Sequence, residues 1–246
     1  MSKADEIFIK NCKDILENGV WDTDREVRPR WEDGTPAHTI KKLWIWQKKS
    51  NNIHDLSSHI WDSWADETGS IGKAYGYQLG KKYVFPEGEF DQVDKVLYDL
   101  RNNPASRRII AHMYNVADLK DMHLYPCAYS MTFNVSGNTL NGILNQRSQD
   151  MLAASNWNVV QYSVLLMMFA RACGLEAGEL VHVVADAHIY DRHVPIVERI
   201  LDNPQYAAPK LIVDESVTDF YKFTKDSFTL VDYQYNEFKD KIPVAI

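Results

Sequence analysis

The sequence predicts an α+β protein in which a mixed β-sheet packs with helices, as a single domain over residues 1–246. Segments with helical spacing and segments with strict alternation occur in the same chain. They follow one another without the regular strand and helix alternation of a doubly wound fold. With 45% hydrophobic and 25% charged residues, the composition is that of a globular protein and excludes disordered or low-complexity classes.

The first predicted element is a helix over residues 4–16, where apolar side chains recur at helical spacing and Gly19 follows as a stop. Charged residues, proline and glycine dominate residues 21–39, which predicts a loop. The end of a helix follows at 43–47, and a short aromatic segment at 59–65.

The middle of the chain supplies the predicted sheet. A helix at 91–100 has one apolar face and leads to a strand at 107–114. Residues 129–135 alternate between apolar and polar side chains, as in a half-buried strand. A turn at 136–138 joins this strand to a partner that ends near Arg147, so the two form a hairpin.

The second half begins with an apolar stretch at 157–173, which Gly174 closes. Polar residues interrupt this stretch, so it falls short of a membrane span and predicts a buried helix. A strand at 180–184, a helix at 193–201 and a strand at 211–213 follow, and the tail at 242–246 is apolar.

Charge and cysteine content limit the partners and the compartment. The net charge is −7, and basic residues occur in pairs rather than along a stripe, which disfavours nucleic-acid binding. The first ten residues lack the apolar core of a signal peptide, so we expect a cytoplasmic protein without a membrane partner. Three widely spaced cysteines predict free thiols rather than disulfides or a zinc site.

Cys127 is a candidate nucleophile because it lies at the entrance of the alternating strand. The alternative is an inert buried cysteine, which is common. A reactive thiol needs a nearby cation to lower its pKa. The predicted hairpin allows Arg147 to return beside Cys127 and to act as that cation.

Several polar residues are candidates for binding a small anion or a sugar. Arginines at the ends of apolar strands suit a phosphate, although exposed surface charge is the alternative. Asp150 and Asn158 approach the buried helix either as capping residues or as ligand contacts. The candidate arginines are Arg28, Arg107, Arg108 and Arg147, the last followed by Ser148.

The densest polar cluster allows two interpretations. The i, i+5 spacing of His188 and His193 matches no usual zinc pattern, so we predict no metal. His188 and Tyr190, two residues apart, would suit hydrogen bonds to a sugar hydroxyl. A metal-dependent hydrolase would instead use the set His182, Asp186, His188 and His193.

Seven short motifs, in this order, resemble the classical, folate-dependent thymidylate synthase family, and the resemblance covers most of the chain from residue 43 onward. Each motif is modestly specific alone, whereas the ordered set is strong. The family fold is a mixed sheet with helices in a homodimer. The motifs are IWDSWAD at 60–66, AYG at 74–76, NPASRR at 103–108, PC at 126–127, QRSQD at 146–150, WN at 157–158 and DAHIY at 186–190.

The resemblance implies a reductive methylation of dUMP to dTMP, with 5,10-methylenetetrahydrofolate as co-substrate and dihydrofolate as the second product. Cys127 would form the covalent adduct at C6. Catalysis would also involve Tyr75, Asp150 and Asn158, and the enzyme would be a methyltransferase without metal. Folate contacts would come from Trp61, Trp64, Asp150 and Ile246.

The resemblance also assigns the nucleotide contacts. Asn158 would read the uracil edge, and His188 with Tyr190 would bind the sugar hydroxyl. Arg107 and Arg108 would reach the phosphate in the other subunit of the homodimer. The full set for dUMP is Arg28, Arg107, Arg108, Arg147, Ser148, Asp150, Asn158, His188 and Tyr190.

The chain departs from the family pattern at three places. The catalytic glutamate would fall at Lys41, and the strand and helix that normally precede it are absent between Thr39 and Leu43. Either the segment is lost, or the printed sequence omits residues here. We favour omission, because losing a core strand would expose its neighbours. Ala128 replaces a common histidine, and residues 154–156 replace a turn near the folate.

Two alternatives remain besides the hydrolase. A dUMP or dCMP hydroxymethylase of the same family would add water instead of hydride to the same intermediate. Asn158 argues for uracil over cytosine but does not exclude a dUMP hydroxymethylase. If Lys41 replaces the glutamate, the chain would instead be an inactive nucleotide-binding homologue.

Overall fold

A four-stranded mixed sheet with the strand order β4–β5–β6–β8 forms the centre of the computed structural model. The structure describes residues 1–19, 27–29, 44–56, 61–236 and 242–245. Neighbouring strands are antiparallel except β6 and β8, which are parallel, so the predicted mixed sheet is confirmed. The strands are β4 (Ile110–His112), β5 (Ala128–Ser136), β6 (Thr139–Gln146) and β8 (Glu176–Val184).

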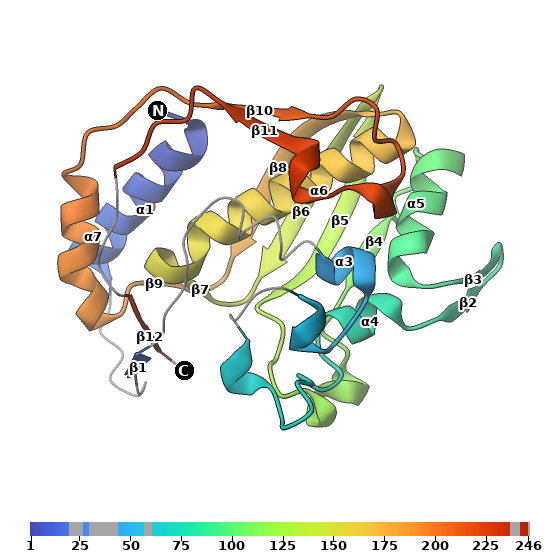
Figure 1. The fold of residues 1–246 in the computed structure, drawn as a ribbon, viewed down its shortest axis with the longest axis horizontal. Helices are drawn as coiled ribbons and strands as arrows, with labels where there is room; N and C mark the ends of the chain where they lie inside the picture. The colour runs from blue at the N-terminus through green and yellow to red at the C-terminus, as the bar shows by residue number, and fades with distance from the viewer. Residues whose placement is uncertain (20–26, 30–43, 57–60, 237–241, 246) are drawn as a thin grey trace.

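Two helices cover one face of this sheet and form the main core with it (Figure 1). They are α5 (Gln92–Asn102) and α6 (Asn156–Cys173). Because α6 is apolar around most of its circumference, it is stable only when it is enclosed by other elements. Gly174 ends α6 in the left-handed conformation with φ 71°, as the sequence predicts.

A second, smaller core joins the helices α1 (Lys3–Asn18) and α7 (Val194–Leu201), which lie side by side (Figure 1). Phe8 and Cys12 of α1 pack against Val197 of α7 and against Met151. Ser2 and Asp5 form a capping box that fixes the start of α1. This core lies next to the segment that leads into α6.

The remaining elements are short. They are β1 (Val27–Pro29) paired with β12 (Pro243–Ala245), α3 (Trp44–Lys48), α4 (Gly76–Gly80), the β2 (Tyr83–Phe85) and β3 (Gly88–Phe90) hairpin, β7 (Gln149–Asp150) paired with β9 (Ala187–His188), and β10 (Lys210–Val213) paired with β11 (Phe228–Val231). Short 3-10 segments join several of them.

The predicted long elements are confirmed, while three local features differ. The strand at 107–114 is only β4, because Pro104 and the following turn precede it. The predicted loop at 21–39 contains β1, which is held by pairing with the distant tail. A π-helix, Met151–Ser155, precedes α6 in a segment for which the sequence predicts no helix.

Candidate active site

A pocket of about 230 Å³ lies where the first turn of α6 meets the ends of β6, β7 and β9. Its walls come from segments far apart in the sequence, so the fold brings these side chains together. Nine residues that the sequence analysis predicts as site residues line it: Trp61, Trp64, Tyr75, Cys127, Ser148, Asp150, Asn158, His188 and Tyr190.

Cys127 and Arg147 lie side by side, as the predicted hairpin requires. The β5–β6 register places Ala128 opposite Gln146, next to both residues. One guanidinium nitrogen of Arg147, Nη2, lies 3.7 Å from Cys127 Sγ. Nε and Nη2 of the same arginine donate to the carbonyls of Pro126 and Tyr125 at 3.1 and 3.0 Å. The backbone before Cys127 therefore holds the cation in place.

The protonation of Cys127 is a correction to the sequence argument. Burial raises the pKa of the thiol above its ordinary value of 9.0, and the charge of Arg147 offsets only part of this effect. The expected lowering by a cation is present but is outweighed by desolvation. The free enzyme therefore holds Cys127 as a neutral thiol at pH 7.

Tyr75 is held in a strained conformation beside Cys127. Its backbone has φ 30° and ψ −94°, which an L-residue rarely adopts. Its hydroxyl accepts a hydrogen bond from the Cys127 backbone N–H at 3.0 Å, and its ring stacks on Trp61 at 4.9 Å. Burial raises the pKa of Tyr75 well above its ordinary value, so the phenol keeps a proton that it can donate in the pocket.

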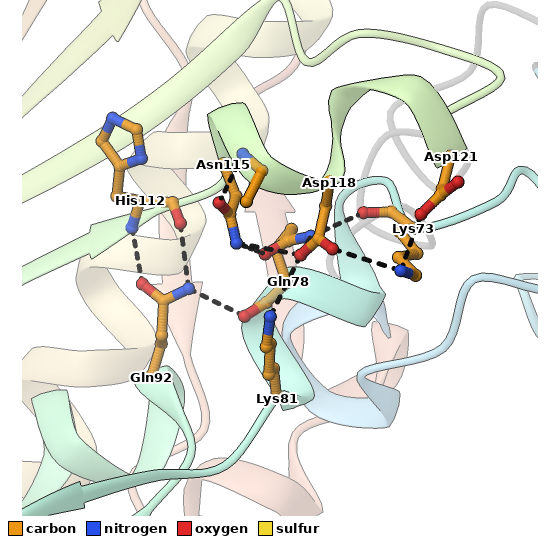
Figure 2. Close-up of polar contacts among 9 residues, drawn as sticks. Lys73, Gln78, Lys81, Gln92, His112, Asn115, Asp118 and Asp121 are labelled. Atoms are coloured by element: carbon orange, nitrogen blue, oxygen red, sulfur yellow. Dashed lines mark hydrogen bonds and ion pairs between the residues drawn. The ribbon is translucent and has the colours of Figure 1, made fainter.

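A polar network fastens α4, the helix that follows Tyr75 (Figure 2). The buried Asp118 carboxylate accepts hydrogen bonds from Gln78 at 3.0 Å and from Lys81 at 3.1 Å. Lys73 and Asn115 donate to the same carboxylate. Hydrogen bonds from Gln78, Lys81 and Lys73 lower the pKa of Asp118 to about 2, so the carboxylate stays charged. This network keeps α4, and with it Tyr75, in place.

Asn158 lies in the first turn of α6 and faces a buried set of amides. Its Nδ2 donates to Oε1 of Gln149 at 3.0 Å and to Oε1 of Gln146 at 3.3 Å. Nε2 of His182 lies 2.9 Å from the same Gln146 oxygen. Burial lowers the pKa of His182, so its ring is neutral at pH 7. The sequence motifs contained these glutamines, but their spacing did not show that they face Asn158.

Asp150 serves the local structure and also lines the pocket. Its Oδ1 accepts from the backbone N–H groups of Leu152 and Ala153 at 3.0 Å, which caps the π-helix. The same oxygen lies 3.6 Å from Nδ1 of the fully buried His193. The two readings that the sequence left open for Asp150, cap or ligand contact, are therefore compatible.

His188 and Tyr190 reach the pocket from β9 and the turn after it. Their rings meet edge to face at 5.0 Å, and Nδ1 of His188 lies 3.5 Å from an oxygen of Asp186. Both side chains are part of the lining. This placement agrees with the prediction that His188 and Tyr190 contact a sugar hydroxyl. The contact itself stays a prediction.

Some predicted site residues lie elsewhere. Arg107 and Arg108 are exposed between α5 and β4 and do not line this pocket. Arg28 lies opposite Val244 in the β1–β12 pair, which brings the C-terminal tail to the same region as β1. The predictions for Ile246 and Lys41 fall outside the described residues.

Sequence reasoning missed part of the lining. Gln161 and Tyr162 follow Asn158 on the pocket side of α6, and Trp46 reaches the pocket from α3. Gln161 could have been found, because it stands three residues after Asn158 and interrupts an apolar run at helical spacing. Trp46 could not, because only the tertiary fold brings α3 to this pocket.

Two findings concern other kinds of site. Within the part of the chain that the structure describes, no group of three or more His, Cys, Asp or Glu residues could hold a metal ion. Among the described helices, none combines the length and the apolar character needed to span a membrane.

The fold and the pocket define a class of protein: an α+β enzyme with a cysteine held beside an arginine, facing aromatic, carboxamide and imidazole groups. Comparison with known proteins then places the chain within this class. The family model described as thymidylate synthase matches residues 35–246. The chain belongs to the thymidylate synthase family, whose members are methyltransferases.

Individual relatives agree with this family. The chain is 40% identical to a thymidylate synthase of Bacillus subtilis subsp. natto, with 96% of this chain and 97% of the relative covered. It is 39% identical to that of Bacillus phage phi3T, over the same shares. Among solved structures, a thermostable thymidylate synthase A from Bacillus subtilis matches with a TM-score of 0.89 and 34% identity, covering all of both chains.

The alignment also shows that this chain lacks residues that its relatives have. The alignment to the natto relative is 271 residues long, whereas this chain has 246, so at least 25 residues of the relative have no counterpart here. We expect the missing segment between Thr39 and Leu43. The pocket residues described above all lie after that point.

Proposed function

We propose that this enzyme methylates dUMP to dTMP with 5,10-methylenetetrahydrofolate, through a covalent adduct between Cys127 and C6 of the base. The observation that carries the proposal is that Cys127, with Arg147 3.7 Å from its sulfur, lines the same pocket as Asn158. All three relatives compared above are thymidylate synthases, which favours methyl transfer over the hydroxymethylase and the inactive homologue.

The nucleophile is activated when the substrate binds. The phosphate of dUMP is bound by Arg147 and Ser148, with Arg28 as a further predicted contact. The sulfur of Cys127 forms a bond to C6 while the electron pair of the C5–C6 bond moves toward C5 and O4, and the thiol proton is taken up at O4 of the enol that forms. The phenol of Tyr75, which burial keeps protonated, lies beside Cys127 and can donate a proton in the pocket.

The aromatic side of the pocket fits the folate. Methylenetetrahydrofolate, when bound, supplies the one-carbon unit and the hydride that completes the methyl group. Trp61 stacked on Tyr75, together with Trp64, offers flat apolar surface to a pterin ring and excludes water. Asp150 offers a carboxylate to the ring N–H groups, and Ile246 belongs to the predicted closing tail.

We also infer a homodimer. The face of the sheet away from α6 carries exposed Ile110 of β4, Ile143 of β6, and Val181 and Val183 of β8. Ile143 lies opposite Val181, so these side chains form an exposed apolar group that a second copy would cover with the same face. In the dimer, Arg107 and Arg108 would reach the phosphate in the partner's pocket.

The compartment follows from the thiols and the chemistry. Cys12, Cys127 and Cys173 are all free, which fits the reducing cytoplasm. A nucleophilic cysteine also needs to stay reduced to act. We therefore place the reaction in the cytoplasm.

The test is the Cys127→Ser variant, assayed for turnover and for binding of dUMP. Turnover should fall by at least about 10³-fold, because a serine hydroxyl is a far weaker nucleophile here, while the affinity for dUMP should change little. Cys173→Ser is the matched control, since that half-buried thiol contacts Leu97 and does not line the pocket. Wild-type turnover in Cys127→Ser would remove Cys127 from the mechanism.

A further inference from the structure

Gln149 is a buried polar residue directly behind the proposed base-reading amide. It belongs to β7, is only 1% exposed, and its backbone N–H donates to the carbonyl of Asp186 at 2.8 Å. Its Oε1 accepts hydrogen bonds from Nδ2 of Asn158 and from Nε2 of Gln146. Burying a carboxamide costs free energy unless its hydrogen-bonding groups have partners, so the partners of Gln149 decide whether it is tolerated here.

The direction of each amide in this set is fixed by backbone carbonyls, which can only accept. Nε2 of Gln149 donates to the carbonyl of Asp150 at 3.2 Å, and Nε2 of Gln146 donates to that of Ser148 at 2.7 Å. The Oε1 atoms of both glutamines therefore point away from these carbonyls, toward Asn158. Two acceptor oxygens face Asn158, so its own amide must present Nδ2 to them.

This orientation determines which base the pocket accepts. Uracil carries a donor at N3 and an acceptor at C4, whereas cytosine carries an acceptor and a donor at these positions. With both hydrogens of Nδ2 donated to the glutamines, Oδ1 of Asn158 is left facing the base, where it accepts from N3–H of uracil. A rotated amide would match cytosine, but it would place Oδ1 against two acceptor oxygens.

We propose that Gln149 is a positioning residue that prevents rotation of the Asn158 amide and so sets the preference for uracil over cytosine. The proposal rests on the proposed function, in which Asn158 reads the base. Gln149 touches no substrate, and its effect is transmitted through the hydrogen bond to Asn158.

The test compares the dissociation constants of dUMP and dCMP by titration calorimetry, which requires no turnover. Gln149→Met keeps the length of the side chain but removes the acceptor, and the preference for dUMP should fall about tenfold or more. Gln149→Glu keeps an acceptor oxygen toward Nδ2 and should retain most of the preference. If Gln149→Met does not fold, the smaller Gln149→Ala takes its place.

Gln92→Met is the matched control, because the side chain of Gln92 bonds to the backbone of Gln78 and His112, which do not line the pocket. It should lower stability without changing the preference. A preference that stays at the wild-type value in Gln149→Met, with both affinities reduced alike, would overturn the proposal and leave Gln149 a structural residue. Failure of the proposed function would show separately, as a wild-type enzyme that forms no dTMP.

Discussion

Cys127 shows how two opposing effects act on one side chain. Burial raises the pKa of its thiol, while Arg147, 3.7 Å away, lowers it, and burial is the larger effect. The arginine is itself tied to the carbonyls of Tyr125 and Pro126, so it cannot move closer. A thiol that is neutral in the free enzyme resists oxidation and becomes reactive only in the bound complex.

Alkylation of the free enzyme by iodoacetamide measures this balance. The rate at Cys127, followed by peptide mass mapping, should keep rising beyond pH 9, because the thiolate forms only above the ordinary pKa. Arg147→Met removes the charge that lowers the pKa, so it should slow the reaction at pH 8 by about fivefold. A midpoint below pH 8 in the wild type would contradict this account.

Residue identities allowed most of the pocket to be predicted, but not its internal contacts. The motifs named Cys127, Asn158 and His188, and the structure brings these residues to one pocket. The net pKa of Cys127 depends on how deeply the folded chain buries it, which no motif encodes. The contact between Gln149 and Asn158 depends on the short β7–β9 pairing, which local sequence does not specify.

At the scale of elements, α4 holds Tyr75 in place. The position of α4 is fixed in turn by the close approach of its backbone at Gly76 to the backbone of Ser50. A Cβ atom added at Gly76 would lie 1.9 Å from the carbonyl oxygen of Ser50, so only glycine fits. The Asp118 network holds the other side of α4 (Figure 2). Together they offset the cost of the strained backbone at Tyr75.

Gly76→Ala should therefore reduce both stability and catalysis. We expect a loss of about 2–4 kcal/mol in the free energy of unfolding, because backbone must move away from backbone. The shift of Tyr75 should lower kcat by about tenfold or more. Urea unfolding and steady-state kinetics measure the two effects.

Gly137→Ala is the control for this substitution. Gly137 has a positive φ of 62°, but nothing lies within 4 Å of an added Cβ, so only a conformational cost of about 1 kcal/mol applies. Its kcat should stay at the wild-type value, because the turn lies at the far end of β5. Equal effects of the two variants would show that the contact with Ser50 is unimportant.

Long elements were predictable, whereas short ones were not. The alternation in β5 and the apolar run in α6 produce strong periodic patterns, which the fold preserves. The π-helix Met151–Ser155 and the two-residue strands β7 and β9 have no such pattern. They form because tertiary contacts hold Asp150 and its neighbours in place.

For the whole molecule, the exposed sheet face is the proposed dimer interface. Val181 and Val183 of β8 continue the apolar surface of Ile143 in β6, and each is more than 40% exposed in the single chain. Arg107 and Arg108 are exposed near β4, at an edge of the same sheet. A dimer through this face would explain why these arginines lie outside their own pocket.

Val181→Asp should dissociate the dimer, since it would place a charge in the interface without a partner. We expect a wild-type dimer of 28.4 kDa chains and a dissociation constant weakened by about 100-fold in the variant, measured by analytical ultracentrifugation. Ile212→Asp, at a similarly exposed position in β10, should leave the dimer intact. A monomeric wild type would refute the assembly.

The missing residues also bear on whether the whole chain converts dUMP to dTMP. The chain is at least 25 residues shorter than the alignment with its natto relative, and the family's catalytic glutamate would fall at Lys41. The fold that surrounds Cys127 is nevertheless present in all its described parts, with a TM-score of 0.89 to a thymidylate synthase. The account therefore predicts that the reaction itself is retained.

The most direct measurement is mass analysis of the nucleotide formed when this 246-residue chain is incubated with dUMP and 5,10-methylenetetrahydrofolate. The account predicts dTMP, formed together with dihydrofolate and absent from the Cys127→Ser control. A hydroxymethylated nucleotide would contradict it in favour of water addition. Unchanged dUMP would contradict it as well, and would identify a nucleotide-binding protein that has lost the catalytic step.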